Sequence, residues 1–220
     1  MKNMIILFAG LKGGTGKSTL CNLFATYAVE QGFPVAVMDA DTQLSLYKNF
    51  FEDLATLGVR NVSTPWRIWS LRADDTVKDK MSKIKKVPGL VIIDCPGSVD
   101  NENLKYIYNS ADIIVMPFRF DRMNVRETVT FAELLKKISK ARQLYLPNMV
   151  TQYDEKREEL RKAMERANSD LGKYGRVLPG IPECLAVRDS NTLGMNYKQR
   201  WAVREAYNVI IEEINTLINK

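Results

Sequence analysis

Residues 10–19 form a glycine-rich segment that contains two lysines, Gly-Leu-Lys-Gly-Gly-Thr-Gly-Lys-Ser-Thr. Its end matches the end of a phosphate-binding loop, in which Lys17 would contact the β- and γ-phosphates of a nucleotide and the Ser18 hydroxyl would join a Mg²⁺ shell. The other lysine, Lys12, creates the arrangement K-G-G-x-G-K-[ST], which is much rarer by chance than a plain phosphate loop. The segment therefore predicts nucleotide binding, and Lys12 indicates how the nucleotide is hydrolysed.

A strand and a helix are predicted on the two sides of this loop. Residues 4–9 are an unbroken apolar run, typical of a buried parallel strand, and apolar residues recur at helical spacing from Leu20 to Ala28. A phosphate loop needs this context, because glycines let backbone N–H groups approach the phosphate oxygens and a helix N-terminus favours an anion. The alternative, a glycine-rich turn with two solvated lysines, is disfavoured because sequence and context agree.

Two carboxylates follow the next apolar segment, within Pro-Val-Ala-Val-Met-Asp-Ala-Asp-Thr-Gln at residues 34–43. Ligands of open α/β sheets bind beyond the carboxyl ends of the strands, where Asp39 and Asp41 would lie. Side chains alternate along an extended chain, so both are expected to point to the same side. There a carboxylate can hold a metal-bound water or orient an attacking water. Capping of a following helix is the alternative.

A further apolar strand ends at Asp94 and is followed by Cys95, Pro96 and Gly97, which is the Walker B layout. Asp94 would bind Mg²⁺ directly or through water. The chain has no histidine and three cysteines at unrelated spacings: Cys21, Cys95 and Cys184. This composition argues against a Cys–His nucleophile and is consistent with free thiols in a reducing, cytoplasmic compartment.

Three segments together resemble the ParA/MinD family of deviant-Walker ATPases: Lys12 to Thr19, residues 35–43 and residues 91–97. The resemblance implies that the chain hydrolyses ATP with Mg²⁺ inside a nucleotide-sandwich homodimer. The loop residues that would bind ATP are Lys12, Gly13, Gly14, Thr15, Gly16, Lys17, Ser18 and Thr19. Lys12 would cross to the ATP of the other subunit and stabilise charge there, as an arginine finger does in trans. Asp41 would position the water, while Asp39 and Asp94 would support the metal.

Two later segments resemble the strands of the same family that lie against the adenine base. The first is residues 143–150, which contain Asn148, and the second is residues 175–179, which end at Pro179. The resemblance implies that Asn148 and Pro179 contact the adenine. Ordinary core or edge strands with turn residues are the alternative for both segments.

Strand and helix patterns alternate along the whole chain, which predicts an α/β fold. We expect three layers, a mostly parallel sheet with helices on both faces, in a single P-loop ATPase domain spanning residues 1–220. Further helices are predicted near residues 74–86, 100–110, 122–141, 154–172 and 199–219. Further strands are predicted near residues 66–71 and 112–116.

The formal net charge of +6 favours a polyanionic partner. Short ParA proteins bind DNA without sequence preference as ATP-bound dimers, and the resemblance implies the same here, with a nucleoid location and a stimulating ParB-like partner. The basic residues assigned to DNA are Arg188, Lys198, Arg200 and Arg204. Such binding would be strongly salt dependent. The predicted function is therefore segregation or positioning of plasmid, chromosomal or mobile-element DNA.

Two other functions use the same phosphate loop. A MinD-like protein would position a protein cargo, but the helical pattern near residues 199–219 has an acidic or neutral polar face, which predicts packing on the body of the protein and no membrane binding. A small-molecule ligase or kinase would need a substrate pocket in place of a dimer. The presence of Lys12 argues against this second alternative.

Overall fold

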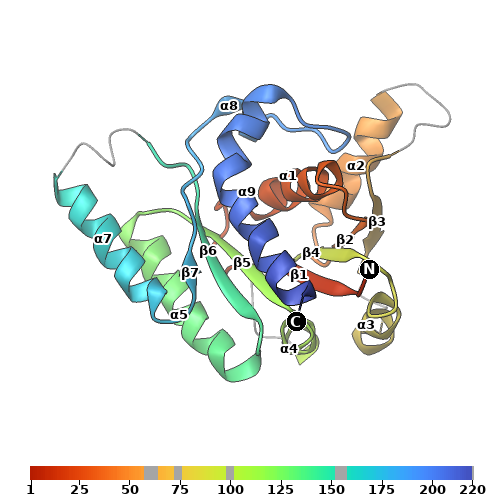
Figure 1. Cartoon of the computed structure of the whole chain (residues 1–220), viewed down its shortest axis with the longest axis horizontal. Helices are drawn as coiled ribbons and strands as arrows, with labels where there is room; N and C mark the ends of the chain where they lie inside the picture. The colour runs from red at the N-terminus through yellow and green to blue at the C-terminus, as the bar shows by residue number, and fades with distance from the viewer. Residues whose placement is uncertain (57–63, 72–75, 98–101, 152–157, 220) are drawn as a thin grey trace.

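A computed structural model describes residues 1–56, 64–71, 76–97, 102–151 and 158–219 of the chain. Seven strands form one sheet in the order β3-β2-β4-β1-β5-β6-β7, and every strand pair is parallel (Figure 1). The strands are β1 (Met4–Phe8), β2 (Val35–Asp39), β3 (Arg67–Ser70), β4 (Leu90–Asp94), β5 (Ile113–Phe118), β6 (Arg142–Pro147) and β7 (Arg176–Val177). The parallel α/β sheet expected from the sequence is confirmed.

Helices connect the strands and cover both faces of the sheet. They are α1 (Lys17–Glu30), α2 (Ser45–Thr56), α3 (Val77–Ile84), α4 (Glu102–Asn109), α5 (Arg122–Ile138), α7 (Glu158–Gly172), α8 (Leu185–Arg188) and α9 (Tyr197–Ile218). Sequence patterns did not predict α2 or the short α8. Leu46, Phe50 and Leu54 of α2 do recur at helical spacing and pack against the core, so the sequence carried a signal for this helix that the prediction omitted.

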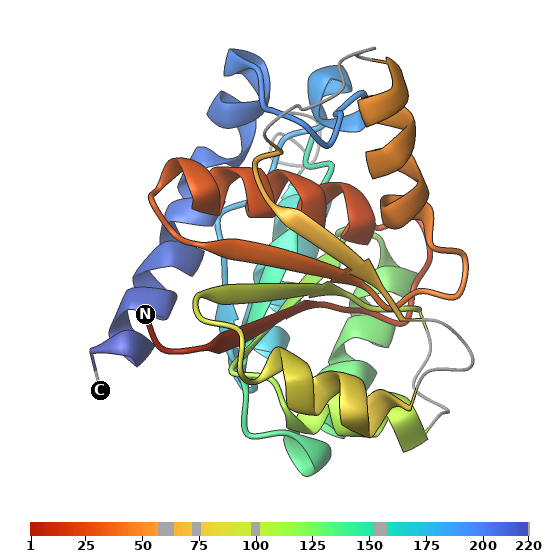
Figure 2. The ribbon, with the colours of Figure 1, turned by 90° about the vertical axis from the view of Figure 1, so that its right-hand side faces the viewer.

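Helices lie on both sides of the sheet (Figure 2), and its two faces bury separate apolar layers. On one face α1, α2 and α9 pack against side chains such as Ile6, Val37 and Ile92. On the other face α3, α4 and α5 pack against alternate residues of the same strands, such as Leu7 and Ile93. The central strands are apolar on both sides because both faces are covered, as in other parallel sheets. The expected three layers are therefore present.

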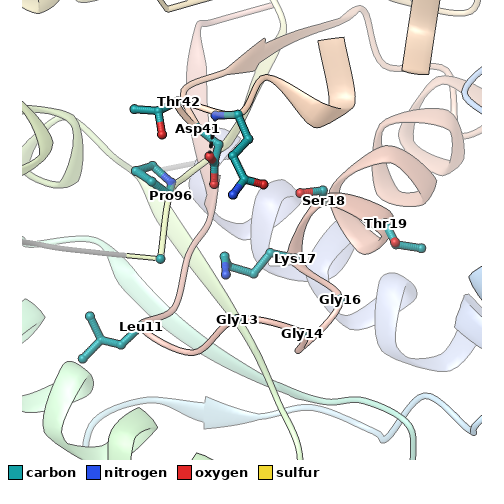
Figure 3. Close-up of a pocket in the computed structure, with 12 residues that line it drawn as sticks. Leu11, Gly13, Gly14, Gly16, Lys17, Ser18, Thr19, Asp41, Thr42 and Pro96 are labelled. Carbon is teal, nitrogen blue, oxygen red and sulfur yellow. Dashed lines mark hydrogen bonds between the residues drawn. The ribbon is translucent and has the colours of Figure 1, made fainter. Parts of the chain in front are cut away.

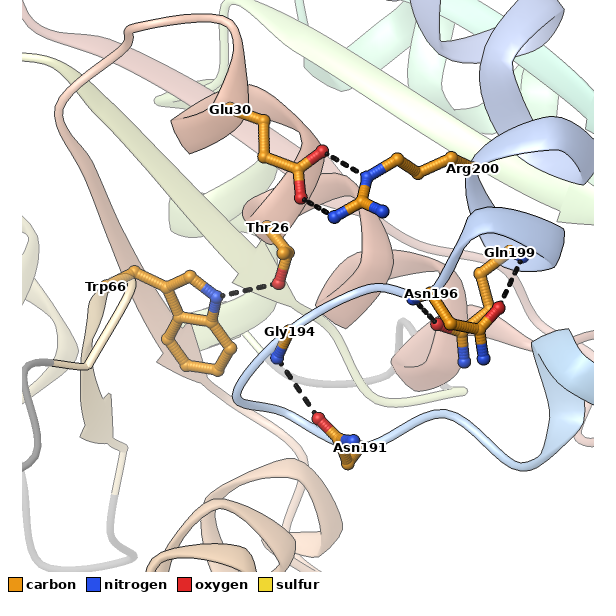
Figure 4. A network of polar contacts seen from close by, with 8 residues as sticks. All are labelled: Thr26, Glu30, Trp66, Asn191, Gly194, Asn196, Gln199 and Arg200. Carbon is orange, nitrogen blue, oxygen red and sulfur yellow. Dashed lines mark hydrogen bonds and ion pairs between the residues drawn. The ribbon is translucent and has the colours of Figure 1, made fainter.

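Helix α9 is fastened to the body of the protein along its length. Its Tyr207 is buried and donates a hydrogen bond to the carbonyl of Leu20 (2.8 Å). Nearer its start, a capping box joins Asn196 and Gln199 (Figure 4). The capping box fixes where α9 begins, and the Tyr207 contact and the buried residues of α9 agree with the packing role predicted for this helix. Within the described residues, no helix is long and apolar enough to cross a membrane.

Candidate functional site

A cavity of about 570 Å³ lies at the carboxyl ends of the central strands (Figure 3). Its walls come from the loops that follow β1, β2 and β4, because parallel strands bring their carboxyl ends to one edge of the sheet. The lining residues are Leu11, Gly13, Gly14, Gly16, Lys17, Ser18, Thr19, Asp41, Thr42, Gln43, Pro96 and Gly97. The three sequence segments that carry the family resemblance are thus brought together around one cavity.

Two glycines give the loop after β1 its shape. Gly14 and Gly16 have φ values of 75° and 90°, in the left-handed region that side chains rarely adopt. Gly16 is the N-cap of α1, so the helix begins at Lys17 with its free N–H groups facing the cavity edge. A Cβ at Gly16 would also lie 2.4 Å from Nδ2 of Asn148, so only glycine fits this position. The loop therefore has the backbone of an anion-binding site.

Lys17 projects into this cavity between the loop and Asp41 (Figure 3). Its Nζ donates a hydrogen bond to the carbonyl of Lys12, 3.0 Å away. This contact folds the ammonium group back over the loop, where the phosphate oxygens of a nucleotide would lie. A carbonyl is a weaker partner for an ammonium than a phosphate is, so a bound anion would replace this contact readily.

Asp94, at the end of β4, is a buried carboxylate. The residue is 1% exposed, and neither carboxylate oxygen has a hydrogen-bond partner among the described residues. Burial raises the pKa of Asp94 to about 7, although the nearby Ser18 hydroxyl and Lys17 act in the opposite direction. Two unsatisfied buried oxygens beside a hydroxyl suit a hard cation, since such cations take oxygen ligands.

Asp39 ends the neighbouring strand β2 and is the register partner of Asp94. It is fully buried, but its oxygens are engaged: Oδ1 accepts from the backbone N–H of Asp41 (3.0 Å) and Oδ2 from that of Tyr47 (2.9 Å). Burial raises the pKa of Asp39, while these hydrogen bonds lower it. Asp39 thus holds the turn after β2 and the start of α2, which is the capping role left open by the sequence. Neither Asp39 nor Asp94 is among the residues that line the cavity, but both oxygens of Asp39 are already occupied by backbone N–H groups, so any support it gives to a metal would be indirect.

Asp41 does line the cavity, in contrast to Asp39. Its Oδ1 accepts a hydrogen bond from the backbone N–H of Gln43 (2.9 Å), which fixes the side chain while leaving Oδ2 available. The alternation of side chains along a strand predicted that Asp39 and Asp41 point to the same side. The structure separates them because the strand ends at Asp39 and the chain turns before Asp41.

Lys12 lies on the rim and is not among the residues that line the cavity. Its Nζ is 3.7 Å from Oε1 of Glu127 and 3.4 Å from the sulfur of Met123, both on α5. The side chain is 36% exposed, so water reaches the ion pair. The two lysines of the loop therefore point in different directions, Lys17 inward and Lys12 outward.

A second cavity, of about 460 Å³, adjoins the first at Gly16 and Thr19. Asn148 lines it, is buried, and donates from Nδ2 to the carbonyl of Thr15 (2.9 Å), which locks the end of β6 against the phosphate loop. The structure places Pro182 on this cavity, whereas Pro179 is exposed and outside its lining. The contact of Asn148 and Pro179 with the adenine stays a prediction, and the proline that lines this cavity is Pro182.

Two polar residues on the second cavity were missed in the sequence: Arg119 and Glu183. Arg119 directly follows β5, as Asp41 follows β2 by two residues. A polar residue just beyond the carboxyl end of a buried strand was therefore a usable signal, although no motif marked it.

The four basic residues assigned to DNA occupy different settings. Arg188 lines the second cavity. Arg200 makes a two-pronged ion pair with Glu30, through Nε (2.8 Å) and Nη2 (2.7 Å) (Figure 4). Nζ of Lys198 lies 5.9 Å from the centroid of the Tyr197 ring, and Arg204 is exposed. All four are exposed, with Arg188 on α8 and the other three on α9, which α8 contacts; of the four, Arg200 is held in an ion pair.

A family model described as the CobQ/CobB/MinD/ParA nucleotide binding domain matches residues 6–196, which include the phosphate loop, Asp41, Asp94 and Asn148. The chain belongs to this family. Membership confirms the resemblance to ParA and MinD proteins expected from the sequence. A search of curated proteins gives no significant match.

Solved structures of this family share the fold over nearly the whole chain. A putative plasmid partition protein from Borrelia burgdorferi B31, bound to AMPPNP, has a TM-score of 0.73 and 20% identity, with 98% of this chain and 99% of that chain covered. Apo McdA from Cyanothece has a TM-score of 0.74 and 15% identity, with 96% and 99% covered. The cell division ATPase MinD of Pyrococcus furiosus has a TM-score of 0.70 and 21% identity, with 97% and 99% covered. At such low identity these likenesses establish the fold alone.

Proposed function

We propose that this chain is a ParA-like ATPase that closes an ATP-dependent sandwich dimer, binds DNA without sequence preference and segregates or positions a DNA cargo. The observation that carries the proposal is the divergence of the two loop lysines. Lys17 points into the cavity of its own subunit, whereas Lys12 stands on the rim and faces α5. From the rim, Lys12 would reach a nucleotide held by a second copy.

The residues around the first cavity divide the work of hydrolysis. The loop N–H groups and Lys17 would bind the phosphates of ATP. Asp41 would orient a water that attacks the γ-phosphorus, so that the bond to the bridging oxygen breaks and ADP and phosphate leave. Lys12 of the second subunit would stabilise the negative charge that develops, a contribution worth roughly 10³–10⁵ in rate when an arginine makes it in trans.

The residues present fit a Mg²⁺ ion between Asp94 and Ser18. The two carboxylate oxygens of Asp94 have no hydrogen-bond partner among the described residues, and the Ser18 hydroxyl lies nearby. No group of three or more acidic, histidine or cysteine side chains in the described residues could hold a metal by itself. The ion would therefore depend on phosphate oxygens and water for its remaining ligands, and it would neutralise charge on the phosphates when bound.

Two contacts would change when the dimer closes. The ammonium of Lys12 would leave Glu127, and that of Lys17 would exchange a carbonyl for phosphate. Contacts to the γ-phosphate would favour the closed state, because ADP cannot make them. DNA would then bind the dimer through accessible basic residues such as Lys198 and Arg204. Release would follow hydrolysis, which a ParB-like partner would accelerate.

The proposal is tested with the Asp41→Ala protein, which should bind ATP and dimerise but not turn it over. Light scattering gives its mass with ATP and with ADP, and co-sedimentation with duplex DNA is measured at low and high salt. The expected result is a dimer with ATP only, carrying DNA that is lost at high salt. Dimers that ignore DNA would support a MinD-like cargo protein. A monomer with both nucleotides would point to a small-molecule ligase or kinase.

Two variants separate the roles of the lysines. Lys17→Ala should lose nucleotide binding, whereas Lys12→Ala should bind ATP but dimerise poorly. Lys137→Ala, an exposed lysine on α5 away from the cavity, is the matched control and should behave as the unaltered protein. An unchanged dimer with Lys12→Ala would remove the argument for a sandwich.

A further inference from the structure

A groove lies at the opposite edge of the sheet from the nucleotide site. It consists of two adjoining cavities, of about 270 and 510 Å³, that share Trp69, Lys83 and Val87. We call it the α3 groove, because the end of α3 forms one wall and edge strand β3 forms the other; Figure 2 faces this edge of the sheet. Its other residues come from the segments just before β2 and β4, so it opens at the amino ends of those strands.

The floor of the α3 groove is apolar. Trp69 pairs in register with Met38, whose side chain is buried on the α3 face of the sheet, so Trp69 points toward the same face. Ile84, at the end of α3, and Val87, just after it, line the groove beside Trp69 on this face of the sheet. Trp69 is only half-buried, so an apolar surface that includes an indole is left open to an incoming group.

The rim of the α3 groove is strongly basic. Four cationic side chains line it: Arg67, Lys80, Lys83 and Lys86. Residues 78–86 contain five lysines and a single acidic residue, Asp79. In the described parts of the chain, neither Lys83 nor Lys86 has an ion-pair partner. Lys83 and Lys86, which lack such a partner there, stand beside an apolar floor and would attract a ligand that carries both negative charge and an apolar group.

A partner is not expected to bind by adding a β-strand to edge strand β3. Lys80 donates a hydrogen bond from Nζ to the carbonyl of Ser70 on β3, so one acceptor of the edge strand is already occupied. A lysine laid on an edge strand is a common way of blocking strand pairing. Recognition would therefore rely on side chains in the groove.

We propose that the α3 groove binds an acidic peptide segment of a partner protein, with one apolar side chain seated on Trp69 and flanking Asp or Glu residues on the lysine rim. A nucleic acid suits the groove less well, because the floor offers apolar contacts where phosphates need donors. The site is independent of the nucleotide chemistry, since its residues lie at the other edge of the sheet from the phosphate loop.

The test is a selection of displayed random twelve-residue peptides on the full-length protein, with counterselection on the Lys83→Glu/Lys86→Glu protein. Peptides that survive depend on the groove. We expect them to combine a Leu, Phe, Trp or Ile with neighbouring Asp or Glu residues. A selected peptide, labelled with fluorescein, is then titrated by anisotropy against the variants, and a labelled DNA duplex is titrated alongside.

The expected result is that Lys83→Glu weakens the selected peptide by at least about tenfold. Lys78→Glu, an exposed lysine of the same helix that does not line the groove, is the matched control and should weaken it much less. Trp69→Ala should weaken it as well, and ATP binding should persist in Lys83→Glu as evidence of folding. Selection of no peptide, peptides without acidic residues, equal loss with Lys78→Glu, or loss of DNA alone would each overturn the proposal.

Discussion

The ends of β2 and β4 carry the same residue at the same register and use it in opposite ways. Asp39 and Asp94 are paired across the two strands, and both are buried. Asp39 receives backbone hydrogen bonds from Asp41 and Tyr47, whereas Asp94 has none. The difference arises from the segment after each strand: a tight turn into α2 after Asp39, and Cys95-Pro96-Gly97, which curves past the phosphate loop, after Asp94. Asp39 therefore stabilises the turn into α2, whereas the carboxylate of Asp94 is available to bind a ligand.

The largest expected effect is the contribution of Asp94 to the pH dependence of the unfolding free energy, in the protein without nucleotide or metal. Its folded-state pKa of about 7 lies above the ordinary value of 3.8, so the folded state holds the proton more tightly than the unfolded state does. The stability that this group contributes is therefore fully present below its unfolded pKa of 3.8 and is lost as the pH rises through its folded pKa of about 7. From pH 5 to pH 8 this group should cost the unaltered protein about 3 kcal/mol of unfolding free energy.

Asp94→Asn should lack this loss, so its stability relative to the unaltered protein should improve on going from pH 5 to pH 8. Urea unfolding at both pH values in the presence of EDTA measures the difference. An equal pH dependence in the two proteins would show that Asp94 is satisfied by a partner after all. The same substitution should weaken Mg²⁺-dependent ATP binding.

The next effect should come from Asp39 and should have the opposite sign. Asp39→Ala leaves the N–H groups of Asp41 and Tyr47 without their acceptor, and we expect a loss of about 2 kcal/mol in unfolding free energy at neutral pH. Urea unfolding at pH 7.5 measures it. If Asp39→Ala were as stable as the unaltered protein while Mg²⁺ dependence disappeared, the roles assigned to the two aspartates would have to be exchanged.

The smallest effect should come from a carboxylate at the surface. Glu127 is 32% exposed and pairs with Lys12 at 3.7 Å, so solvent screens the interaction. Glu127→Gln should change the unfolding free energy by less than about 1 kcal/mol. Equilibrium unfolding checks this expectation. A change as large as that of Asp39→Ala would mean that the Lys12 side chain is held far more firmly than its exposure indicates.

Sequence alone determined the strands, the phosphate loop and the family of this chain. Apolar runs of strand length and glycines at required backbone positions are local features, so the β1-loop-α1 unit and the strands ending at Asp39 and Asp94 could be located from their own residues. The connection of these units into a parallel sheet followed from their alternation with helices.

The tertiary structure alone decided which polar groups are satisfied and which residues meet. The role of Asp39 depends on the N–H of Tyr47, eight residues away, and that of Asn148 on Thr15, 133 residues away. The same limit explains why the lining of the second cavity by Pro182, and the position of the α3 lysines beside Trp69, could not be read from the sequence. Hydrogen bonding and burial depend on distances between segments, and periodicity along the chain does not contain those distances.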